Sequence, residues 1–225
     1  MATTRRRRPP RAAPPPLPPE RRTVGQLVAE TIRFYGRHFW RSLLLGLGPA
    51  VIADAGYFVG FHPWLGAVVA GWILLATASY VGGALLVTGA RPGRRVAGTA
   101  FAVGAAVSLP LLAGFVWLAP LGLAVPAVVA ERIPLRAAFS RGLELARADY
   151  AHALGAQVTL LLVVFLTQVL LTALLHGASQ QSTHVSAFLA NLVVSPILFL
   201  GGALLYHDQA ARAKLKSGTR APREA

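Results

Sequence analysis

Long apolar stretches alternate with short basic clusters along this chain. The stretches that contain no lysine or arginine cover residues 42–90, 96–131 and 148–211. They are rich in Leu, Val, Ala, Phe and Ile, and a helix needs roughly 20 apolar residues to cross the hydrocarbon core of a bilayer. The pattern therefore predicts an all-α protein built as a polytopic membrane helix bundle.

Four segments have the length of one crossing each. They are residues 42–61, 64–90, 155–175 and 185–206. The segment 64–90 is the longest of the four, and a helix of that length can cross with a tilt.

A fifth apolar segment, residues 96–130, could cross once or twice. As a single helix it would be roughly 50 Å long, which is too long for one ordinary crossing. Two crossings fit better, with a break near Pro120 in residues 117–122. The positions of the charges also favour two crossings here. Together with the other four segments they make six transmembrane helices, which place every basic cluster on one side of the membrane. Five would leave the cluster at 132–147 on the opposite side.

The basic residues set the expected orientation. All 22 lie in four clusters, at 5–41, 91–95, 132–147 and 212–223. Short loops rich in lysine and arginine stay in the cytoplasm, so we expect a multi-pass protein of the inner membrane with both termini cytoplasmic. The formal charge of +14 does not indicate nucleic acid, because the charges flank apolar segments instead of forming one basic stripe on a folded surface.

Composition excludes an ordinary water-soluble domain. Hydrophobic residues make up 55% of the chain and charged residues 13%, whereas a soluble domain carries about 25% charged residues. The chain has no cysteine, which excludes disulfides and thiolate metal sites. It also shows no phosphate-binding loop, nucleophile elbow or paired carboxylates, so we expect neither an enzyme nor a cofactor.

The two ends of the chain are expected to be tails. Residues 1–22 are rich in arginine and proline, and such proline density favours an extended, disordered segment. We interpret it as a cytoplasmic tail attracted to anionic lipid headgroups, not as a cleaved signal, because no apolar core follows the arginines closely. A proline-recognising partner is the alternative. Residues 212–225 form a second basic cytoplasmic tail, and the membrane domain spans 23–211.

An amphipathic segment precedes the first crossing. Thr23 and Gln26 have the spacing of a capping box, and apolar residues then recur at helical intervals. Arg33, Arg37 and Arg41 lie four residues apart on a face of their own. We expect a cytoplasmic interfacial helix whose three arginines contact lipid headgroups.

A second amphipathic segment covers residues 134–154. Pro134 can begin the helix, which we expect to lie at the cytoplasmic interface. Its expected apolar face consists of Leu135, Ala138, Phe139, Leu143, Ala146 and Tyr150.

Three sequence stretches carry a resemblance to a known family. They are FYGRHFW, LAVPAVVAERIPLRAAFSRGLELARADY and SPILFLGGALLYHDQAAR. In this order they resemble the membrane-domain family of glycerophosphoryl diester phosphodiesterases and its stand-alone, uncharacterised bacterial relatives. The matching positions are Phe34, Tyr35, Phe39, Trp40, Pro126, Glu131, Ala138, Arg141, Tyr206 and Asp208.

The resemblance implies an architecture more than an activity. It suggests an aromatic interfacial helix before the first crossing, an amphipathic helix after Glu131, and a last crossing that ends in Tyr-x-Asp. This chain differs in having His207 where a second tyrosine is usual and Gly142 where serine is common. The likeness does not include the soluble phosphodiesterase domain, so its metal chemistry is not carried over.

Asp54 is the only acidic residue inside a predicted crossing. An intramembrane carboxylate is a candidate for proton or ion handling, and a neutral or solvated structural carboxyl is the other interpretation. Gln168 and Asn191 are candidate partners of Asp54 in an intramembrane polar site. Both lie on polar faces, Gln168 with Gln157 and Thr172, and Asn191 with Ser195, and these faces could equally serve helix–helix hydrogen bonding.

Three histidines fall at the predicted outer face. They are His62, His176 and His184, and they come from two loops without the spacing of a zinc site. We therefore expect solvated histidines and no bound metal.

Two functions remain compatible with the sequence. One is a non-enzymatic membrane-organising or accessory protein, which needs only helix packing and contact with membrane lipids. The other is a transporter or lipid-handling protein with a polar site around Asp54. A second copy of the chain and another membrane protein are both open as partners.

Overall fold

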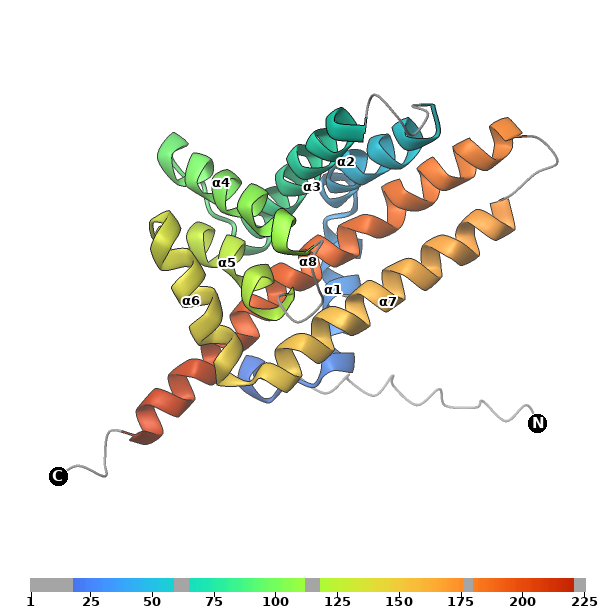
Figure 1. Ribbon diagram of the computed structural model, residues 1–225. Coiled ribbons are helices and arrows are strands. Elements are labelled where there is room, and N and C mark those ends of the chain that lie inside the picture. The colour runs from blue at the N-terminus through green and yellow to red at the C-terminus, as the bar shows by residue number, and fades with distance from the viewer. Residues whose placement is uncertain (1–17, 59–64, 112–117, 176–179, 221–225) are drawn as a thin grey trace, which may run out of the picture.

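A computed structural model describes residues 18–58, 65–111, 118–175 and 180–220 of the chain. These residues form helices and connections and no strand, which confirms the all-α prediction for this part of the protein (Figure 1). The elements are η1 (Pro19–Arg21), α1 (Val24–Arg37), α2 (Phe39–Phe58), α3 (Leu65–Thr88), α4 (Arg94–Leu111), α5 (Leu118–Glu131), α6 (Leu135–Ala148), α7 (Tyr150–Leu175) and α8 (Gln180–Arg220).

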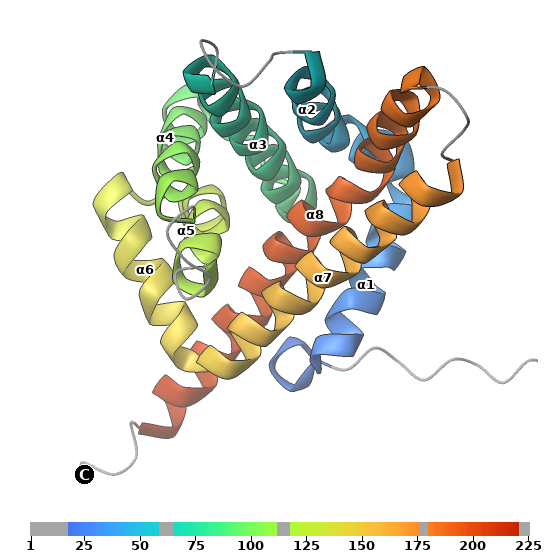
Figure 2. The same cartoon turned by 45° about the vertical axis from the view of Figure 1, so that its right-hand side comes forward.

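Helix α8 is the central element of the bundle. It has 41 residues and is about 60 Å long. Helix α7 runs antiparallel along one side of it, while α2 and α3 pack on another side (Figures 1 and 2). The helix continues through residues 212–220, which we expected to form a separate tail.

Glycines allow the helices around α8 to approach closely. A Cβ atom on Gly46 of α2 would lie 2.0 Å from the carbonyl oxygen of Leu192 in α8. A Cβ on Gly201 of α8 would lie 2.5 Å from the side chain of Leu160 in α7. Small residues at such points are typical of membrane helix packing, because they bring the backbones into contact.

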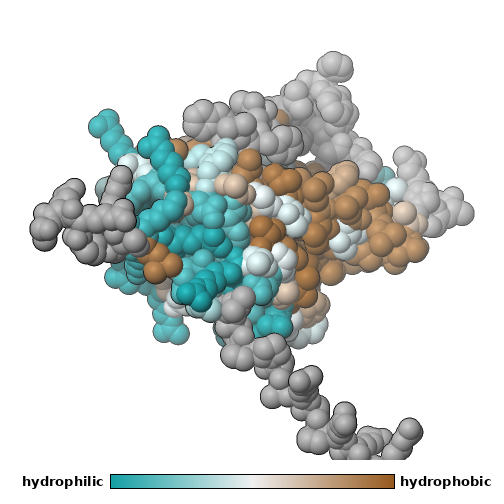
Figure 3. Space-filling view, turned by 90° about the horizontal axis from the view of Figure 1, so that it is seen from below, coloured by the Kyte–Doolittle hydropathy of each residue, from teal (hydrophilic) through white to brown (hydrophobic). Residues whose placement is uncertain are grey.

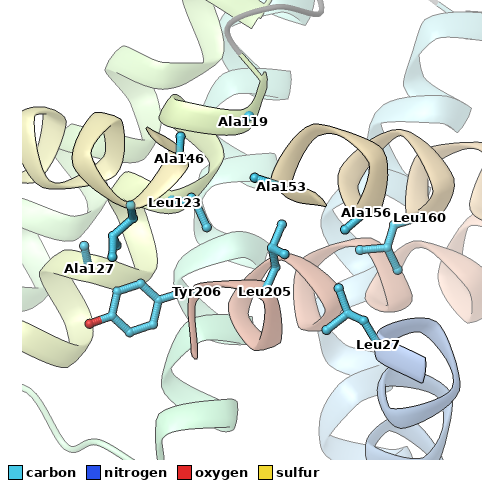
Figure 4. Close-up of a cluster of buried hydrophobic side chains, with 11 residues drawn as sticks. Leu27, Ala119, Leu123, Ala127, Ala146, Ala153, Ala156, Leu160, Leu205 and Tyr206 are labelled. Carbon is cyan, nitrogen blue, oxygen red and sulfur yellow. The ribbon is translucent and has the colours of Figure 1, made fainter. Parts of the chain in front are cut away.

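One core cluster joins α8 to α1, α5, α6 and α7. Leu205 and Tyr206 contribute from α8, and Leu27 contributes from α1 (Figure 4). The other members are all alanines and leucines: Ala119, Leu123, Ala127, Leu145, Ala146, Ala153, Ala156 and Leu160. The amphipathic helices α1 and α6 are therefore partly covered by the bundle.

The beginning of α1 agrees with the sequence prediction. The Thr23 Oγ1 atom accepts a hydrogen bond from the Gln26 backbone N–H at 3.3 Å, and Gln26 Oε1 accepts from the Thr23 N–H at 2.8 Å. The predicted capping box is confirmed. Leu27, Thr31 and Tyr35, spaced by four, form the buried face of this helix.

Only part of the predicted apolar face of α6 packs against the bundle. Ala138 and Ala146 are buried, whereas Leu135, Leu143 and Tyr150 are each more than a third exposed. The helix turns a smaller residue inward, because a Cβ on Gly142 would lie only 2.4 Å from the carbonyl oxygen of Pro120 in α5. The α5 backbone therefore selects the face that contains Gly142.

The predicted break in the fifth apolar segment, at residues 117–122, falls partly outside the described residues. Helix α4 ends at Leu111 and α5 begins at Leu118, so Pro120 lies in the first turn of α5, where proline is tolerated. The residues between the two helices lie outside the described part. Helix α5 has 14 residues and rises about 21 Å, less than the about 30 Å of a hydrocarbon core.

Three helices in the described part are long and apolar enough to cross a membrane. The spans are Val69–Thr88 in α3, Tyr150–Leu175 in α7 and Ser182–Ser217 in α8. Figure 3 shows hydrophobic surface at one end of the molecule and hydrophilic surface at the other. These features indicate a membrane protein.

Candidate functional site

Gln168 and Asn191 lie together between α7 and α8. Gln168 Nε2 donates hydrogen bonds to Asn191 Oδ1 at 3.0 Å and to Ser195 Oγ at 3.1 Å. Asn191 Nδ2 in turn donates to the backbone oxygen of Ala187 at 2.9 Å. The predicted pair is thus a hydrogen-bonded link between two antiparallel helices.

Asp54 lies apart from this pair. Its Oδ1 atom is 3.7 Å from Nδ1 of His184, and its carboxylate is about one third exposed. Gly46 lies opposite Leu192 in the antiparallel α2–α8 pair, so Asp54, eight residues further along α2, reaches the level of His184. Asn191 is seven residues, or about 10 Å, further along α8. The three predicted site residues therefore do not form one cluster.

The two other outer-face histidines, His62 and His176, lie outside the described residues. The part of the chain that the structure describes holds no group of three His, Cys, Asp or Glu side chains suited to a metal ion.

The three predicted headgroup arginines lie on the surface. The side chains of Arg33 and Arg37 are each 62% exposed, and both reach the carboxylate of Glu30, at 3.2 and 3.6 Å. Arg41 is also exposed. Two of the three positive charges are thus partly balanced within α1.

Glu131 is the centre of a polar cluster at the junction of α5, α6 and α8. It accepts hydrogen bonds from Arg141 Nε at 2.9 Å and from the Tyr206 hydroxyl at 2.8 Å. Arg141 also contacts Glu144 at 2.8 Å. Burial alone would lower the pKa of Arg141, but its hydrogen bonds to Glu144 and Glu131 outweigh burial and raise that pKa.

The turn that follows Glu131 has a strained backbone. Arg132 has a φ of 57°, in the left-handed region that residues other than glycine rarely adopt. Its N–H still bonds to the carbonyl oxygen of Val128 at 2.9 Å, so it ends α5 in the way a glycine commonly does. This turn directs α6 back across α5.

Two further ion pairs bind the end of α8 to distant segments. Arg22 Nη1 lies 2.9 Å from Asp208 Oδ1, and Asp208 is fully buried. Arg212 lies 2.5 Å from Asp149 and also donates to the backbone oxygen of Arg22 at 2.7 Å. The segment before α1, the α6–α7 junction and the end of α8 therefore meet at one end of the bundle.

A cavity of about 360 Å³ lies between six helices. Its lining contains no charged side chain. The polar residues of the lining are Thr77, Tyr80, Gln157, Gln168 and Ser195. Among its apolar lining residues are Trp72, Leu160, Val164, Phe165 and Phe199.

Glycines of neighbouring helices make room for the polar side chains of this cavity. A Cβ on Gly104 of α4 would lie 2.6 Å from Thr77, and a Cβ on Gly122 of α5 would lie 2.3 Å from the Gln157 amide. Tyr80 donates a hydrogen bond to the carbonyl oxygen of Gly122. The cavity can accommodate an uncharged molecule and offers it hydrogen-bonding groups.

Sequence reasoning missed Thr77 and Tyr80, which lie in a continuous apolar segment. A polar residue in such a segment is a weak signal by itself, because its glycine partner lies on another helix. For Gln157, the sequence predicted only a position on a polar helix face and not a place in a cavity.

Comparison with known protein families, with curated proteins and with solved structures gives no match for this chain. The resemblance drawn from the sequence therefore stays a prediction, although three of its positions, Glu131, Arg141 and Tyr206, are in contact in the structure.

Proposed function

We propose that this chain is an integral inner-membrane protein with six crossings and both termini in the cytoplasm. In this proposal it is a non-enzymatic membrane-organising or accessory protein that acts through contact with lipid. The observation that carries the proposal is the surface of α7. Only 11% of the most apolar stretch of this helix is buried inside the bundle. Such a surface is stable in contact with hydrocarbon and is a liability in water.

The ion pairs at one end of the bundle support the orientation. Arg22 pairs with Asp208 and Arg212 pairs with Asp149, next to the basic helix α6. Three of the four basic clusters thus have members at the same end. That arrangement is the one expected if these clusters share the cytoplasmic side.

Exposed arginines on α1 and α2 support lipid contact on that side. Arg33, Arg37 and Arg41 remain accessible beside the exposed ring of Trp40, which is 78% exposed. Aromatic and basic residues together are typical of the headgroup region. We expect anionic lipids to be preferred, and more so at low salt.

Reporter fusions test the topology. Fusions after Arg95, Arg147 and Arg220 should be cytoplasmic, and fusions within 178–182 should be external. An external signal at Arg147 would contradict six crossings and leave five.

The second candidate function is transport or lipid handling. The observation that favours ion handling is the Asp54 carboxylate, which lies in the apolar helix α2 at 3.7 Å from the ring of His184. Asp54→Asn keeps the shape but removes the charge, so a transport role predicts loss of pH-dependent proton flux in liposomes. Equal flux in the wild type and the variant would end that role. The uncharged cavity favours lipid handling.

A further inference from the structure

The cavity among α2, α3, α4, α5, α7 and α8 has the size of a ligand site. It is partly open at the surface of the bundle and measures about 360 Å³. That volume falls within the usual range for small-molecule pockets, about 300 to 1,000 Å³.

The lining defines the charge of a suitable ligand. All lining residues are uncharged, and most are apolar. A phosphate or carboxylate placed there would lose its hydration without gaining an opposite charge, which is strongly unfavourable. The cavity therefore suits an uncharged molecule with a large apolar body.

Two buried polar atoms define a second requirement. Gln157 is 5% exposed and Thr77 is 2% exposed, and both line the cavity. Gln157 Oε1 and Thr77 Oγ1 have no hydrogen-bond partner among the described residues. A buried polar atom without a partner is costly, so a ligand that supplies one would be stabilised.

A hydroxyl group meets both requirements at once. It can donate to the Gln157 carbonyl oxygen or accept from the Thr77 hydroxyl.

The surface around the cavity indicates where the ligand comes from. Trp72 of α3 is 37% exposed and Phe165 of α7 is 56% exposed, and both line the cavity. The cavity therefore reaches the apolar surface of the bundle, beside the exposed Leu162 and Leu166 of α7. A ligand dissolved in the bilayer can enter without passing through water.

We propose that this cavity binds an uncharged membrane lipid with a free hydroxyl group, of the diacylglycerol type, and that the Gln157 side chain accepts a hydrogen bond from that hydroxyl. This proposal rests on the proposed membrane location. It adds one specific lipid site to the lipid contact made by the surface of the bundle.

Photolabelling in phosphatidylcholine vesicles tests the site. The full chain is incubated with diacylglycerol that carries a diazirine in one acyl chain, and labelled peptides are mapped by mass spectrometry. We expect labels on α3 and α7 near Trp72 and Phe165. Ala76→Phe, which places a ring in the cavity, should lower labelling at least about fivefold. Ala173→Phe makes the same change at an exposed position of α7 and should leave labelling unchanged.

The hydroxyl requirement is tested with a second pair of probes. The wild type should prefer the diacylglycerol probe over its acetyl ester by about fivefold, the value of one net hydrogen bond. It should also prefer the diacylglycerol probe over a phosphatidylglycerol probe with the same acyl chain, because the phosphate would lose its hydration in the uncharged cavity. Gln157→Leu should remove the preference over the acetyl ester while retaining labelling in the cavity. Because Gln and Leu are similar in size, this variant tests the site even if Ala76→Phe does not fold.

The outcomes separate this proposal from the proposed function. Equal labelling of the wild type by the hydroxyl and acetyl probes, or unchanged labelling of folded Ala76→Phe, would overturn the lipid site alone. Release of the chain from membranes by an alkaline wash would instead overturn the membrane location.

Discussion

Glu131 offers the sharpest test of what holds the polar end of the bundle together. Its carboxylate joins α5 to Arg141 of α6 and to Tyr206 of α8. Glu131→Gln keeps the size of the side chain but removes its charge. Arg141 retains Glu144 as a partner, so the change weakens the cluster without isolating the guanidinium.

The expected cost follows from burial. Glu131 and Arg141 have side chains 27% and 25% exposed. Hydrogen bonds to charged groups contribute about 1.5 to 3 kcal/mol when buried, so after discounting for solvent we expect Glu131→Gln to lower the free energy of unfolding by about 2 kcal/mol. Tyr206→Phe should cost about 1 kcal/mol, and a double-mutant cycle of the two should give a coupling of about 1 kcal/mol.

Glu144→Gln is the matched control. Glu144 contacts the same arginine at 2.8 Å, but its side chain is 64% exposed, so we expect a loss below about 0.5 kcal/mol. The free energy of unfolding can be measured by titrating sodium dodecyl sulfate into detergent micelles while tryptophan fluorescence is followed. Equal losses for Glu131→Gln and Glu144→Gln, or a coupling near zero between Glu131 and Tyr206, would refute this account of the cluster.

Three further predictions use the same unfolding assay. Gly142→Ala places a Cβ 2.4 Å from a carbonyl oxygen of α5 and should destabilise by about 2 kcal/mol, whereas Gly155→Ala meets nothing within 4 Å and should be neutral or slightly stabilising. Arg132→Gly should stabilise by about 1 kcal/mol, because glycine adopts the positive φ without strain; an unchanged or lower stability would contradict this. Arg22→Gln should cost about 3 kcal/mol by leaving the buried carboxylate of Asp208 without its partner, and adding Asp208→Asn should recover part of the loss; no recovery would show that Arg22 acts through packing alone.

Local features of the fold could be predicted from the sequence. The capping box of Thr23 and Gln26 depends on residues three apart, and the structure confirms it. The apolar segments became helices because their length and composition are also local properties. Pro120, near which the sequence predicts a break, lies in the first turn of α5, where proline is tolerated.

Which polar residues meet could not be predicted, because it depends on how helices pair. The close approach of Gly46 to Leu192 fixes the alignment of α2 with α8, and that alignment places Asp54 beside His184 instead of Asn191. The sequence contains no local signal for this alignment. The face of α6 that packs inward, which contains Gly142, is similarly set by the α5 backbone that it contacts.

The central position of α8 has a consequence for biosynthesis. This helix leaves the ribosome after the other described helices, yet it packs against η1, α1, α2, α3, α5, α6 and α7. Charged loops that precede it can fix the orientation of earlier helices during insertion, but those helices lack their common partner until α8 has been made. A nascent chain that stops before Gln180 would be inserted but unassembled. Such truncated chains should be substrates for membrane proteases, and the synthesis of α8 is the step that makes the bundle resistant.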